Sequence, residues 1–135
     1  MEYRKSYRGF VLWLAGYTAS VFLPLLLPEG ADAGLTLRLV QNLTSLGIVV
    51  LIWIIWRTES VYWINGTTFE QARDAGSARR RAFAAAHLKR FGLFALGYAA
   101  FSAFMQLRGY SFVIDIAVFT VGIIAVAVST IRIKL

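Results

Sequence analysis

The chain has no cysteine and only one histidine, His87, among its 135 residues. It can therefore form no disulfide, no thiol nucleophile and no cysteine-ligated metal site. One histidine cannot complete a metal site alone, and no glycine-rich phosphate-binding loop occurs. Most of the seven acidic residues lie near the N-terminus or in predicted loops, so no carboxylate pair or nucleophile–base set stands out. We expect no enzymatic activity and no cofactor.

Charge is also scarce for a chain of this length. Charged residues make up 16% of the sequence and hydrophobic residues 59%, whereas a soluble domain keeps roughly a quarter of its residues charged. The formal net charge of +7 would suggest nucleic acid as a partner if it formed a patch on a soluble scaffold. Here the basic residues flank apolar runs instead. We therefore expect a lipid bilayer, and no nucleic acid, as the partner.

Four apolar runs are long enough to cross a membrane as helices, which takes roughly 20 residues each. They are Gly9–Leu27, Leu35–Trp56, Phe91–Leu107 and Tyr110–Ile131. The first run, at roughly 19 residues, exceeds the roughly 7–15 of a cleaved signal peptide, so we interpret it as a retained span. The sequence predicts an all-α integral membrane protein, a four-helix bundle forming a single domain over residues 1–135.

Basic residues are distributed very unevenly between the two predicted membrane faces. Only Arg38 and Arg108 lie on one face. The other face carries Arg4, Lys5, Arg8, Arg57, Arg73, Arg79, Arg80, Arg81, Lys89, Arg90, Arg132 and Lys134. The positive-inside rule then predicts that both termini and the loop 57–90 are cytoplasmic, in the plasma membrane or bacterial inner membrane.

The loop 57–90 has signals of helical structure. Thr67 and Glu70 match a capping box that would begin a short helix, and Gly76 would end that helix. Three consecutive arginines follow, Arg79, Arg80 and Arg81. They could contact anionic lipid headgroups, although topology alone accounts for them. We expect His87 to be an interfacial packing residue.

Polar residues inside the spans gather toward one end of the bundle. The second run contains Arg38, Gln41, Asn42 and Ser45, of which positions 38, 42 and 45 share one helical face. The third run has a stripe of small residues, Ala95, Ala99 and Ala103, that would permit close helix packing. We interpret both features as internal packing of the bundle.

The fourth run contains a carboxylate, Asp115, in the apolar stretch "SFVIDIAVF". Asp115 lies about 8 Å inside its span and Arg38 about 6 Å inside the second, counted from the same face at about 1.5 Å per residue. Because either charge alone would be costly in lipid, the depths predict an Arg38–Asp115 ion pair, with Asn42 able to add a hydrogen bond. Arg108 is the rival partner for Asp115.

These features predict a small membrane protein that acts without enzymatic chemistry, as a homo-oligomer or as an accessory subunit of a membrane complex. The alternative is a transporter or channel for a small solute or ion that uses Asp115, since intramembrane acids commonly mark such routes. Four packed helices leave little room for a pore, so that alternative requires a larger assembly.

Overall fold

The computed structural model describes residues 3–28, 30–64 and 66–135. Over these residues the chain is all-helical and contains no strand, which confirms the all-α part of the predicted fold class. The elements are α1 (Arg8–Val21), η1 (Leu23–Leu26), α2 (Ala33–Thr58), η2 (Val61–Trp63), α3 (Phe69–Leu107) and α4 (Phe112–Thr130).

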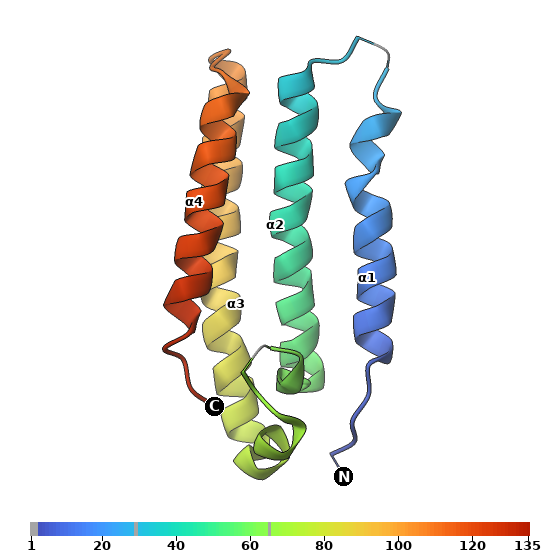
Figure 1. Ribbon diagram of the computed structural model, residues 1–135, viewed down its shortest axis with the longest axis vertical. Coiled ribbons are helices and arrows are strands. Elements are labelled where there is room, and N and C mark those ends of the chain that lie inside the picture. The colour runs from blue at the N-terminus through green and yellow to red at the C-terminus, as the bar shows by residue number, and fades with distance from the viewer. Residues whose placement is uncertain (1–2, 29, 65) are drawn as a thin grey trace.

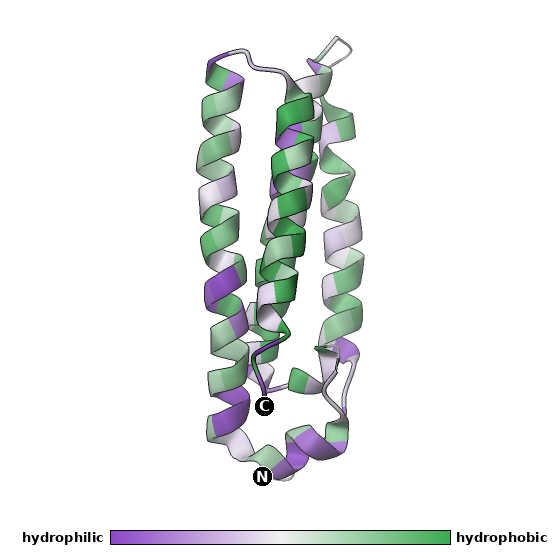
Figure 2. Cartoon of the chain, turned by 60° about the vertical axis from the view of Figure 1, so that its left-hand side comes forward, coloured by the Kyte–Doolittle hydropathy of each residue, from purple (hydrophilic) through white to green (hydrophobic). Residues whose placement is uncertain are grey.

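The four long helices run alongside one another, and the two ends of this assembly differ (Figure 1). One end holds both termini together with η2 and the first turns of α3. We call it the basic end, because the basic residues other than Arg38 and Arg108 lie toward it. The opposite end holds the turns α1–α2 and α3–α4. Hydrophilic residues gather toward the basic end and hydrophobic residues cover most of the rest (Figure 2).

Among the described residues, three helical segments are long and apolar enough to cross a membrane. They are Arg8–Leu26, Ala33–Thr58 and Phe112–Thr130. Few of their residues are buried inside the protein, so most of their apolar side chains need another apolar environment. The chain is therefore a helical membrane protein. α3 is not among the three segments, and basic residues occupy much of its first half.

The end of the first helix and the start of the second differ from the predicted boundaries, and a single residue accounts for each difference. The first α-helix stops at Val21 and continues as the 3₁₀ turn η1, because Pro24 near its start has no backbone N–H to donate. Asp32 caps α2 by accepting from the backbone N–H groups of Gly34 and Leu35. The predicted spans ended at Leu27 and began at Leu35 instead.

The predicted loop 57–90 is mostly helical. α3 begins at a capping box formed by Thr68 and Gln71, one residue later than the predicted pair of Thr67 and Glu70. Gly76 interrupts the helix with φ 77° and ψ 161°, as predicted, a conformation that glycine adopts readily. Asn65 lies outside the described residues.

The helices do not close into the predicted four-helix bundle. α2 contacts α1, α3 and α4, whereas α1 contacts neither α3 nor α4. α1 is instead held against α2 by close packing: a Cβ on Gly47 would lie 2.4 Å from the ring of Tyr17. The alanine stripe on α3 does not serve internal packing, since Ala99 and Ala103 are exposed.

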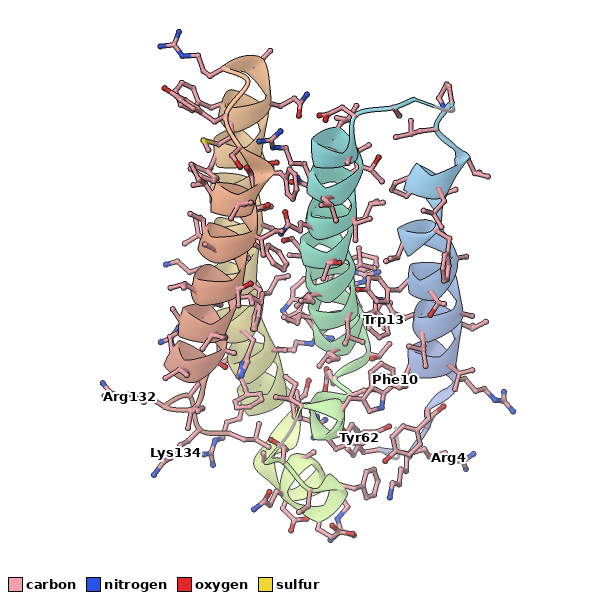
Figure 3. The ribbon with its side chains drawn as sticks, turned by 45° about the horizontal axis from the view of Figure 1, so that its top comes forward. Arg4, Phe10, Trp13, Tyr62, Arg132 and Lys134 are labelled. Carbon is pink, nitrogen blue, oxygen red and sulfur yellow. The ribbon has the colours of Figure 1, made fainter. Side chains whose placement is uncertain are left out.

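The best-buried apolar cluster lies at the basic end. Its centre is formed by residues of α2, η2 and α3, namely Ile55, Val61, Tyr62, Ala72, Phe83 and Ala84. The Tyr3 ring stacks on Phe69, with 5.3 Å between ring centroids, so the N-terminal segment covers one side of this cluster. Phe10, Trp13 and Tyr62 lie along the same side of the molecule (Figure 3).

Candidate functional site

The predicted pair of Arg38 and Asp115 forms a buried ion pair near the opposite end. Arg38 Nη2 donates to Asp115 Oδ2 at 2.9 Å, and the two side chains are 6% and 0% exposed. Arg38 lies in the second turn of α2 and Asp115 in the first turn of α4. The pair therefore joins two helices that are far apart in the sequence.

Arg38 also binds two groups that sequence reasoning missed. Its Nη1 donates to Gln106 Oε1 of α3 at 2.6 Å, and Nη2 donates to the Tyr110 carbonyl at 2.7 Å. The Tyr110 carbonyl is available because it lies in the turn between α3 and α4, outside either helix. One guanidinium thus connects α2, the end of α3, the turn and α4.

Three buried side-chain atoms, two of them in the pair and one about two turns farther along α2, have no hydrogen-bond partner among the described residues. They are Asp115 Oδ1, Arg38 Nε and Ser45 Oγ. An unpaired buried acceptor or donor costs about 1–3 kcal/mol. The site is therefore not fully satisfied by the protein's own groups.

A second set of hydrogen bonds continues from the pair toward the middle of the helices. Asn42 Nδ2 donates to Ser102 Oγ of α3 at 3.1 Å and to the Arg38 carbonyl at 2.8 Å, rather than to the Asp115 carboxylate. Tyr98 OH donates to Gln41 Oε1 at 2.6 Å. Arg38, Gln41 and Asn42 of the second span thus bind α3, through partners that carry no sequence signal beyond being polar in an apolar helix. Ser45, the fourth predicted polar residue, does not.

Arg108, the rival partner, does not reach Asp115. It is exposed, and its guanidinium lies 5.7 Å from the centroid of the Phe104 ring. This position matches its place just past the end of α3, where a long side chain can extend toward water.

A second ionic site lies at the basic end and is centred on Glu59. Arg80 Nη2 and Nε donate to Glu59 Oε2 at 2.8 and 3.0 Å, Arg81 Nε donates to Oε1 at 2.8 Å, and Ser77 Oγ donates to Oε1 at 2.6 Å. We call these four residues the Glu59 cluster. It ties the end of α2 to the segment of α3 that follows Gly76.

Glu59 adopts a left-handed backbone conformation, with φ 59°. A residue other than glycine pays about 1–3 kcal/mol in such a conformation, and the hydrogen bonds of the cluster offset that cost. Burial raises the pKa of the Glu59 carboxyl, but hydrogen bonds from Ser77, Arg81 and Arg80 outweigh burial and lower its pKa below 4.5. Glu59 is therefore ionised at neutral pH.

The three predicted headgroup arginines have separate roles. Arg80 is buried, lies 4.1 Å from the centroid of the Tyr3 ring and donates to the Ala72 carbonyl, so it is not available to lipid. Arg81 belongs to the Glu59 cluster, although its side chain is 60% exposed. Arg79 donates to the Leu135 carbonyl at 2.7 Å. Of the three arginines for which the sequence allowed headgroup contact, buried Arg80 is the one that the structure withdraws from lipid.

A hollow of about 1110 Å³ lies at the basic end between α3, the end of α4 and residues 131–135. Its lining includes buried Phe83 and His87, exposed Ile124, and the charged residues Asp74 and Arg79. His87 is buried, and its Nδ1–H donates to the Phe83 carbonyl at 2.9 Å. Burial lowers its pKa and the Arg90 charge adds to this effect, while the bond to Phe83 opposes it. The ring is therefore neutral at pH 7.

Within residues 3–28, 30–64 and 66–135, no three His, Asp or Glu side chains come together in a way that could hold a metal ion. The polar side chains instead form hydrogen bonds between helices. The charged ones among them form two ionic sites, one buried among apolar helices and one at the basic end.

Comparison with known proteins gives no relative: no protein-family model, no curated protein and no solved structure matches this chain.

Proposed function

We propose that the chain is a four-span membrane protein with both termini and residues 57–90 in the cytoplasm, in the plasma or bacterial inner membrane. The fourth span would be formed by residues 91–107 of α3, which pack against α2 and α4. The twelve-to-two asymmetry of basic residues and the location of both termini at the basic end (Figure 1) support this orientation.

We further propose that the protein has no enzymatic activity and acts as a homo-oligomer or as an accessory subunit of a membrane complex. This proposal rests on the partners of the buried Arg38 and Asp115 side chains. Arg38 donates hydrogen bonds to Asp115, Gln106 and the Tyr110 carbonyl, so the pair holds α2, α3 and α4 together. α1, which contacts α2 alone among the long helices, leaves most of its surface for lipid or for another chain.

The second candidate is a transporter or channel in which Asp115 carries an ion or proton. One observation favours it: Asp115 Oδ1 is buried and has no hydrogen-bond partner among the described residues. A free carboxylate oxygen at membrane depth could accept a proton or a cation.

Cysteine labelling tests the orientation, because the chain has no native cysteine. Ala31→Cys lies in the turn between η1 and α2, and Ala78→Cys lies on an exposed position of α3 at the basic end. A membrane-impermeant thiol reagent applied to intact cells should label Ala31→Cys and spare Ala78→Cys until the cells are lysed. The reverse pattern would contradict the orientation.

Flux and mass measurements test the role. Liposomes containing the purified protein should show no proton or cation flux above that of empty liposomes, and Asp115→Asn should leave this unchanged. The mass of the purified assembly should exceed the 15.1 kDa of one chain, either as a multiple of it or with a second protein at fixed stoichiometry. A flux that Asp115→Asn abolishes, in a variant that still folds, would establish the second candidate instead.

A further inference from the structure

A second hollow lies at the basic end, on another side of α4 from the one that holds His87. It is a groove of about 820 Å³ between α3 and α4. Its apolar part is formed by Leu93, Phe94, Ala125 and Val126, and the arginines Arg90 and Arg132 lie at its polar end. An apolar groove that ends in two cations has the amphipathic form of a single lipid molecule.

The two arginines are available to an anion. Arg90 Nη1 donates to the Ser129 carbonyl, which fixes the guanidinium beside the end of α4 and leaves most of its five N–H donors unused. Arg132 makes no hydrogen bond or ion pair with any other described residue, and its side chain extends away from the helices (Figure 3). Among the residues that the structure describes, no acidic residue lines the groove.

We propose that this groove binds one anionic phospholipid, with the headgroup phosphate between Arg90 and Arg132 and an acyl chain against Leu93, Phe94 and Ala125. The inference rests on the proposed membrane orientation, which places this end of α4 among the headgroups of the cytoplasmic leaflet. Anionic lipids are the charged ligands found there.

Two comparisons within the molecule support this assignment. Arg80 and Arg81 share the single negative charge of Glu59, so the triple-arginine segment has less positive charge to offer than its sequence suggests. The larger hollow beside His87 is lined by Asp74 as well as by Arg79 and Lys134, and the carboxylate weakens its attraction for an anion. The groove between α3 and α4 combines unopposed positive charge with an apolar wall.

A structural alternative is that the two arginines only stabilise the end of α4, where cations interact favourably with the helix dipole. A lipid-binding measurement distinguishes this stabilising role from the proposed lipid site. Delipidated protein in detergent can be titrated with phosphatidylglycerol or phosphatidylcholine of the same acyl chains, and bound lipid counted by native mass spectrometry. We expect one phosphatidylglycerol to bind in preference to phosphatidylcholine.

The charge variants have matched controls. Arg90→Gln and Arg132→Gln should each weaken phosphatidylglycerol binding about fivefold, the factor expected for one basic residue near an anionic lipid. The single variants Lys89→Gln and Lys134→Gln each remove one positive charge from the same end of the molecule, but neither lysine lines the groove. These controls should retain binding. An equal loss in the controls would show general electrostatic attraction and overturn the proposal.

A second pair of variants tests the apolar wall without changing charge. Ala125→Trp fills the groove and should lower lipid occupancy, whereas Ala117→Trp, two turns away on α4 and outside the groove, should not. Unchanged binding in Ala125→Trp would overturn the assignment of the acyl chain. Displacement of the lipid by inorganic phosphate alone would identify a site for soluble anions and also overturn the proposal.

The binding measurement and the orientation can fail separately. Cysteine labelling reports the orientation without reference to lipid, while the titration in detergent reports binding without reference to orientation. Selective binding with a reversed labelling pattern would keep the groove as a lipid site and overturn only its assignment to the cytoplasmic leaflet.

Discussion

Two ionic connections join α2 to the helices that follow it, and they differ mainly in their surroundings. At the opposite end Arg38 and Asp115 are 6% and 0% exposed. At the basic end Glu59 is 14% exposed and its partners Arg80 and Arg81 are 9% and 60% exposed. The N–O distances of 2.8–2.9 Å are nearly the same in both places.

Equal distances do not imply equal energies. A buried charge that loses its partner stays unsolvated, so breaking a buried pair is far more costly than breaking one that water can reach. The Glu59 cluster also divides one carboxylate among three donors, so each donor matters less. We therefore expect the stability of the protein to depend more on the Arg38–Asp115 pair than on the cluster.

The largest effect is expected from Asp115→Asn or Arg38→Gln. Each leaves its former partner buried without an opposite charge, which costs about 3–5 kcal/mol. Thermal unfolding in detergent measures the loss. Arg108→Gln is the matched control at the same end, since Arg108 is exposed and pairs with no acid among the described residues, and it should unfold close to the parent. A large loss in that control would mean that any charge change at this end is destabilising.

Glu59→Gln should have a smaller effect, about 1.5–3 kcal/mol, the range for hydrogen bonds to charged groups. It should also change the response to acid. Because the folded-state pKa of Glu59 lies below its ordinary value of 4.5, its ionised form stabilises the fold above that pH, and this contribution is lost as the pH falls below 4.5. The free energy of unfolding, measured from pH 6 to pH 3, should fall less steeply in Glu59→Gln than in the parent. Parallel pH profiles would contradict the role given to the cluster.

Thr68→Ala should cost about 0.5–2 kcal/mol of local stability, because it removes the side chain that caps α3. Hydrogen exchange should accelerate over residues 69–75 and not in α2. Thr67→Ala is the control, since Thr67 is outside the capping box. Faster exchange in the control and not in Thr68→Ala would restore the boundary predicted from sequence.

The smallest effect is expected from Arg81→Gln, at about 0.2–1 kcal/mol, because its side chain is mostly in water. Salt should reduce that difference further, since solvent ions screen exposed pairs. Arg80→Gln should cost more and respond less to salt. Equal losses for the two arginines would show that exposure does not decide their contributions.

Hydrophobic patterning predicted the helices and the depth of Arg38 and Asp115, because membrane spans must be long, apolar and internally hydrogen-bonded. Depth along a helix follows from residue counting at a fixed rise, so two charges at one level could be paired from the sequence. The rotation of each helix does not follow from counting. That is why Gln106, the Tyr110 carbonyl and Ser102 were missed as partners.

The packing of α1 against α2 alone could not be predicted from the sequence either. A bundle of four similar apolar helices can close or remain open, and the choice depends on contacts such as the one between Gly47 and Tyr17. At the basic end, the prediction took the arginines at 79–81 as one group. Their helix turns them by about 100° per residue, which separates buried Arg80 from its exposed neighbours.

The measurement that tests the account most directly is a double-mutant cycle on Arg38 and Asp115. Removing both charges leaves no unpaired ion in the apolar interior, so the double variant Arg38→Gln with Asp115→Asn should recover much of the stability that either single variant loses. Such recovery would show that the two residues act as one structural unit. Losses that simply add would contradict this, and the intramembrane carboxylate of Asp115 would then have to be explained as an ion or proton site.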